Sequence, residues 1–154
     1  MNYSNIITTL KSVTKLNPCV YSSALFLLNS WLCAYYGFNV YAALFGILTI
    51  TSLLFHTTPR NHPHKIFFNV MDKIAVFSVV VYGAWTLWNN WKKYDVKAQF
   101  LVIATFLSTI ILFSVGYIFA IFCYDPVWGD VWHALLHIIS VVGHAFLLLL
   151  MRVY

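Results

Sequence analysis

The chain has 154 residues, of which 62% are hydrophobic and 8% charged, with a formal net charge of +5. Soluble domains carry about 25% charged and about 45–50% apolar residues. So few charges cannot solvate the surface of a 17.7 kDa globule. The composition therefore excludes an ordinary soluble domain, a disordered tail and, despite the positive charge, a nucleic-acid binder. It predicts an integral membrane protein.

Length and cysteine spacing narrow the architecture further. A membrane-spanning helix needs about 20 mostly apolar residues, so the length allows at most about six or seven spans and no separate soluble domain is expected. The three cysteines, Cys19, Cys33 and Cys123, are far apart and show no CxxC spacing. A disulfide framework or a thiolate zinc site is therefore not expected. We interpret the cysteines as small residues buried in a helical bundle.

Five apolar stretches predict an all-α transmembrane helical bundle of about five spans. A polar segment covers residues 1–19, and a single bundle covers residues 20–152. The predicted spans are residues 20–38, 40–57, 66–88, 98–124 and 128–151. The fourth stretch is long for one span and too short for two with a turn, so we expect one tilted helix. Aromatic residues predict an interfacial belt at the end of the third span, formed by Trp85, Trp88, Trp91 and Tyr94.

The positive charges do not indicate which face of the membrane is cytosolic. With five spans, the N-terminal side carries Lys11, Lys15, Arg60 and Lys65, and the other side carries Lys92, Lys93, Lys97 and Arg152. The positive-inside rule gives a tie between these two sets. Orientation and host membrane stay open.

Polar residues inside the predicted spans point to function, because ionisable groups in a membrane are costly and rare. They are Ser52 and His56 in span two, Asp72 in span three, and His133, His137 and His144 in span five. Consecutive spans alternate in direction, so the end of span two and the starts of spans three and five share one side. At a rise of about 1.5 Å per residue, His56, Asp72 and His137 fall in one shallow layer.

The helical period places the histidines on shared faces. His133 and His137 differ by about 40° around their helix. Two imidazoles at this spacing can hold one ion, and a third from a neighbouring helix, His56, leaves one coordination position vacant. Catalytic zinc sites have this layout. We therefore predict that His56, His133 and His137 bind Zn²⁺.

The other polar residues are given lesser roles. His144 lies about 10 Å deeper than His137, too far for the same ion. We expect it to line a pocket together with Thr49 and Ser140. Each polar residue also has a structural interpretation, since a lone histidine in a membrane commonly bonds to a neighbouring helix. Serine commonly bonds back to its own helix. His62 and His64 flank Pro63 in the loop and are expected to be solvated.

The motif Ser52-Leu-Leu-Phe-His56, with Asp72 and His133-Ala-Leu-Leu-His137 before Gly143, resembles the signature of the CREST membrane hydrolase superfamily. That superfamily includes alkaline ceramidases, adiponectin-receptor-type proteins and GPI-anchor remodelling proteins. The resemblance implies that the three histidines bind zinc and that Asp72 and Ser52 act in catalysis. Asp72 would hold and help to deprotonate the water at the ion, and Ser52 would help to stabilise the oxyanion.

Two features of the chain depart from that superfamily. Its members are built on seven spans, and five are predicted here. Ceramidases also resemble one another in an acidic, calcium-binding N-terminal segment, whereas residues 1–19 contain no acid. Calcium is therefore not expected, and the branch of the superfamily is left open.

Three functions are compatible with the sequence. The first is a zinc-dependent hydrolase of a membrane-lipid amide or ester, ceramidase-like, acting on a ceramide-like or other acyl lipid. The second is a non-catalytic receptor-like or scaffolding protein with a structural zinc site. The third is a b-type haem protein, which gives no role to Ser52 or Asp72. Aromatic-rich helix faces leave a seam for a second copy, so a homo-oligomer is also considered.

Overall fold

The computed structural model describes residues 17–122 and 126–153. Within these ranges the chain is helical and has no strand, which confirms the predicted all-α bundle. The elements are α2 (Pro18–Ala24), α3 (Phe26–Tyr35), α4 (Asn39–Thr57), α5 (Lys65–Asn90), the 3₁₀ turn η1 (Trp91–Lys93), α6 (Val96–Phe122) and α7 (Pro126–Val153). Residues 1–16 of the predicted polar segment, and Cys123, lie outside the described residues.

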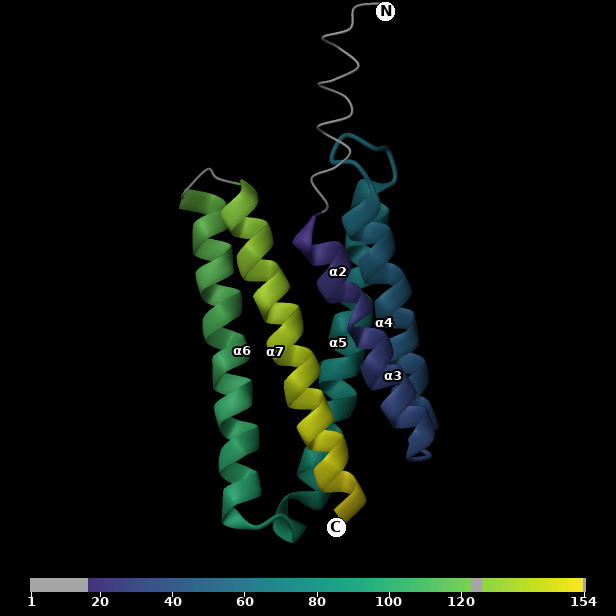
Figure 1. Ribbon diagram of the computed structural model, residues 1–154, viewed down its shortest axis with the longest axis vertical. Coiled ribbons are helices and arrows are strands. Elements are labelled where there is room, and N and C mark those ends of the chain that lie inside the picture. Colours follow the sequence, from purple (N-terminus) through teal and green to yellow (C-terminus); the bar gives the residue numbers. More distant parts are fainter. Residues whose placement is uncertain (1–16, 123–125, 154) are drawn as a thin grey trace, which may run out of the picture.

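Successive long helices run in opposite directions (Figure 1). The start of α2, the end of α4, the start of α5 and the start of α7 therefore lie at the same end of the bundle, which we call the histidine end. Among the described residues, four helices, α4 to α7, are long and apolar enough to cross a membrane. The predicted alternation in helix direction is therefore confirmed.

The first predicted span forms two helices, α2 and α3, which Figure 1 shows as one nearly continuous rod. Leu25, between them, keeps helical backbone angles of φ −64° and ψ −22°. The Asn17 side chain accepts a hydrogen bond from the Cys19 amide at 2.8 Å and so caps the start of α2. Gly37, with φ of 81°, ends the rod in the left-handed conformation that favours glycine, and the chain turns back into α4.

The α2–α3 rod lies between α4 and α7 and packs against both. Small side chains occupy this interface: Cys19, Ser22, Ser23 and Cys33 are all at most 4% exposed. Small residues let helix backbones approach closely. In a membrane the hydrophobic effect does not drive helices together, because lipid is as apolar as their side chains, so close packing of this kind holds the bundle together. Cys19 and Cys33 are free, buried thiols, as expected for residues with a packing role.

Helix α6 lies at the edge of the bundle and packs mainly against α7 (Figure 1). A Cβ atom added at Gly143 of α7 would collide with Thr105 Cγ2 of α6, so glycine permits this close approach. Asp95 caps α6, because its carboxylate accepts from the Ala98 amide at 2.7 Å. The outer face of α6 exposes large apolar side chains such as Phe100 and Phe106, which suits a helix surrounded by lipid.

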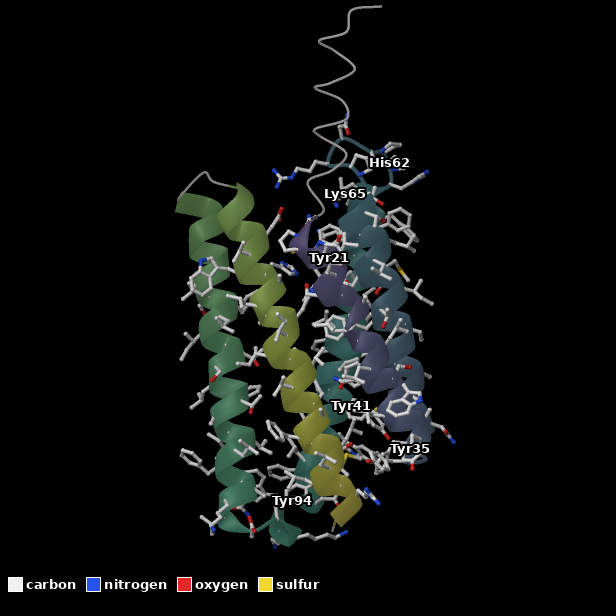
Figure 2. All side chains as sticks on the ribbon, viewed as in Figure 1. Tyr21, Tyr35, Tyr41, His62, Lys65 and Tyr94 are labelled. Carbon is white, nitrogen blue, oxygen red and sulfur yellow. The ribbon has the colours of Figure 1, made fainter. Side chains whose placement is uncertain are left out.

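The predicted aromatic belt differs from the structure at one residue. Trp85 and Trp88 are exposed, as an interfacial belt requires, but Tyr94 is only 4% exposed. Tyr94 follows η1 and precedes α6 at the end of the bundle opposite the histidines (Figure 2). Burial raises the pKa of its phenol above the usual value. The short 3₁₀ turn, which the sequence analysis did not predict, redirects this side chain inward.

Candidate metal centre

Three histidines from two helices meet at the histidine end of the bundle. His56 lies in the last turn of α4, and His133 and His137 lie on α7. One ring nitrogen of each lies within 4.8 Å of the others. The ring centroids of His56 are 4.9 Å from His133 and 5.4 Å from His137, and those of His133 and His137 are 4.6 Å apart. The structure thus brings the three predicted ligands together.

The donor set fits a single transition-metal ion. Zinc–nitrogen bonds are about 2.0–2.1 Å long, so the nitrogens of a tetrahedral site lie about 3.4 Å apart, and the three ring nitrogens here all lie within 4.8 Å of one another. His56 Nε2 is buried and has no hydrogen-bond partner in the described part of the chain. Leaving such a nitrogen unpartnered costs about 1–3 kcal/mol. An all-imidazole set suits zinc, copper, nickel or iron rather than magnesium or calcium.

Asp72 and Ser52 are both buried. Asp72 on α5 is 6% exposed and Ser52 on α4 is 1% exposed. Ser52 Oγ lies 2.9 Å from Ser23 Oγ, which in turn lies 3.5 Å from His137 Nδ1. The side chains of Ser52 and Thr51 lie near the Asp72 carboxylate, whose Oδ1 atom has no hydrogen-bond partner among the residues described. Asp72 is not one of the three clustered donors.

The structure also places two serines of α2 against the site, to which the sequence analysis gave no role. Ser22 Oγ lies 2.9 Å from His137 Nδ1, and Ser23 Oγ lies 3.5 Å from the same nitrogen. Ser23 Oγ also lies 2.9 Å from Ser52 Oγ. One feature of the sequence could have indicated these serines. They are two adjacent hydroxyls near the start of an apolar span, on the side where the other polar residues are predicted to lie.

Lys65 fixes the end of α4 that carries His56. Its Nζ donates to the carbonyl of Phe55 and, at 2.9 Å, to that of Thr58. It also lies 4.0 Å above the centre of the Phe55 ring. A cation at the carboxyl end of a helix satisfies carbonyls that lack intrahelical partners and opposes the negative end of the helix dipole. Figure 2 shows Lys65 at the histidine end, with His62 in the loop beyond it.

The expected pocket-lining residues have different surroundings. Thr49 is buried and donates to the carbonyl of Phe45 in its own helix at 2.8 Å. Ser140 is half-buried on α7. His144 contacts Tyr41, whose hydroxyl lies 2.5 Å from His144 Nδ1. His144 therefore belongs to a separate polar contact, farther from the histidine end. His62 and His64 are exposed and contact each other, outside the three-histidine cluster.

Comparison with known proteins finds no match, whether to a family model, to a curated protein or to a solved structure. The resemblance of the motif to the CREST superfamily therefore stays a prediction.

Proposed function

We propose that the protein is a multi-pass integral membrane hydrolase that binds Zn²⁺ through His56, His133 and His137 and cleaves an amide or ester bond of a membrane lipid, in the manner of ceramidases. The observation that carries the proposal is the convergence of three imidazoles from α4 and α7 within 4.8 Å. Buried serine hydroxyls lie beside this convergence, and the buried Asp72 carboxylate lies near one further hydroxyl, that of Ser52. A three-histidine set leaves one coordination position for water, as catalytic zinc sites do.

The chemistry requires an ion and a base. Zinc at such a site lowers the pKa of a bound water to about 7 and polarises the scissile carbonyl. Asp72 is the base in this proposal, because its Oδ1 atom is buried and without a partner among the described residues. A carboxylate placed there accepts the proton of the attacking water and then donates it to the leaving amine or alkoxide.

Ser52 is proposed to assist at the site. Its Oγ atom lies 2.9 Å from Ser23 Oγ, and Ser23 Oγ lies 3.5 Å from His137 Nδ1. These contacts connect Ser52 with the three histidines. A hydroxyl near the scissile carbonyl can stabilise a developing oxyanion, which is the role that the CREST resemblance implies for Ser52.

The depth of the site suggests the class of substrate. His56 is one residue from the end of α4, and His133 lies about 10 Å from the start of α7. The site thus lies about two helical turns or less below the end of the bundle. In a bilayer this depth matches the boundary between headgroup and acyl chains, where lipid amides and esters are located.

The test is to measure bound zinc and fatty-acid release for the full chain reconstituted in vesicles containing ceramide or an ester-linked acyl lipid. We expect His56→Ala and His133→Ala to lose both metal and turnover, because each removes one of three ligands. His62→Ala is the matched control, since His62 lies outside the cluster, and should keep both. Full metal binding and turnover in the two ligand variants would contradict the proposal.

One observation favours a second candidate, a receptor-like or scaffolding protein with a structural zinc. The α2–α3 rod lies between helices α4 and α7 and packs against both, so an ion shared by His56 and His137 would join them directly. In that case a chelator lowers the melting temperature and no lipid is cleaved. Asp72→Asn separates the two candidates: a hydrolase keeps its zinc and loses turnover by roughly 10²–10⁴-fold. A visible absorption spectrum tests the haem alternative.

A further inference from the structure

The contact between α2 and His137 determines which nitrogen of this histidine is free for an ion. Ser22 Oγ lies 2.9 Å from His137 Nδ1, and both side chains are buried, at 4% and 7% exposure. Since Nδ1 is in contact with Ser22, Nε2 is the nitrogen of His137 that is left for an ion.

The other partner of Ser22 gives its hydroxyl proton a place to go. Ser22 Oγ also lies 3.2 Å from the carbonyl oxygen of Cys19, one turn earlier in α2, and a carbonyl can only accept. A histidine that binds a metal through Nε2 carries its proton on Nδ1 and needs an acceptor there. With its own proton on Cys19, Ser22 Oγ supplies that acceptor at 2.9 Å.

We propose that Ser22 is a positioning residue that fixes the tautomer and ring orientation of His137 for metal binding. The inference rests on the proposed metal site and adds to it a determinant on a third helix, which carries no ligand of its own. Histidine ligands commonly donate their second N–H to a neighbouring acceptor, and loss of that acceptor weakens metal binding by about 10–100-fold. In this chain the acceptor is a serine hydroxyl whose own proton is held by the α2 backbone.

The experiment is a zinc titration against a competing chelator, using the full chain in detergent. We expect Ser22→Ala to bind zinc about 10–100-fold more weakly than wild type. Ser22→Thr keeps the hydroxyl, and threonine in a helix can bond to the carbonyl three or four residues earlier, so it should restore most of the affinity. Ser30→Ala is the matched control. It removes a rod serine that donates to the Ala42 carbonyl of α4 at 2.8 Å, away from the cluster, and should bind zinc as wild type does.

Two further readouts separate positioning from a general structural role. Melting temperatures of the metal-free proteins show whether Ser22→Ala and Ser30→Ala destabilise the fold alike. The visible bands of the Co²⁺-substituted proteins, which depend on ligand geometry, should change in Ser22→Ala only. Equal zinc affinity and identical Co²⁺ spectra for wild type and Ser22→Ala would overturn the inference and leave the metal site intact.

A measurement on the unmutated protein covers the case in which Ser22→Ala does not fold. Nitrogen-15 NMR of the metal-free wild type distinguishes the two neutral tautomers of each histidine. We expect the Nδ1–H form for His137, and an Nε2–H form would overturn the inference. If the wild type binds no metal at all, both the proposed function and this inference are wrong.

Discussion

Two regions of the bundle place histidines among buried polar groups, and the two regions differ in the side chains that contact those histidines. At the histidine end, three imidazoles face one another and His56 Nε2 has no hydrogen-bond partner in the described chain. Farther along α7, His144 is bonded to the Tyr41 hydroxyl and packs edge-on against the rings of Tyr41 and Phe45. A histidine within a span is thus a candidate ligand only when its nitrogen is free and other donors converge on it.

Removing one histidine from each region tests most directly whether only the three-histidine region binds zinc. We expect His137→Ala to lose nearly all bound zinc, because two imidazoles remain where three are needed. His144→Ala should keep about one zinc per chain, since His144 lies outside the three-donor cluster. Metal content of the purified proteins, measured by elemental mass spectrometry, checks both. Retention of zinc by His137→Ala would mean that the cluster is not the binding site.

A second substitution tests whether the deeper region serves packing. A Cβ atom at Gly83 of α5 would lie 2.7 Å from the Tyr41 hydroxyl and 3.3 Å from His144 Cε1. Gly83→Ala must displace that contact, and overpacking of this kind costs about 1–3 kcal/mol. We expect a lower melting temperature and unchanged zinc content. A loss of zinc at equal stability would show that the two regions are coupled.

The smallest expected effect concerns the hydrogen bond itself. Tyr41→Phe removes the hydroxyl that contacts His144 and leaves the ring packing largely in place. Hydrogen bonds between membrane helices contribute about 0.6 kcal/mol on average and about 1.7 kcal/mol at most. Denaturant unfolding in detergent should show a loss in this range, with zinc affinity unchanged. A loss larger than that of Gly83→Ala would contradict the view that packing dominates this region.

Much of the candidate site could be predicted because helical periodicity and alternating direction are local rules. The four-residue spacing of His133 and His137 places them on one face whatever the rest of the fold does. Alternation brings the end of α4 and the starts of α5 and α7 to one end of the bundle. His56 therefore meets the two histidines of α7, and Asp72 lies toward the same end. The division of the first span at Leu25 and the burial of Tyr94 escaped prediction, because both are local features that the length of an apolar run does not report.

The apolar composition and the spacing of the polar residues were enough to determine an all-helical membrane-compatible bundle with His56, His133 and His137 near one end, since both follow from properties of individual segments. The tertiary structure alone decided that the α2–α3 rod lies between α4 and α7, that Ser22 contacts Nδ1 of His137, and that His144 contacts the Tyr41 hydroxyl. The reason is geometric: alternation fixes the direction of each helix but neither its neighbours nor its rotation about its axis. Those depend on which small residues let two backbones approach, and therefore on the packing of the whole bundle.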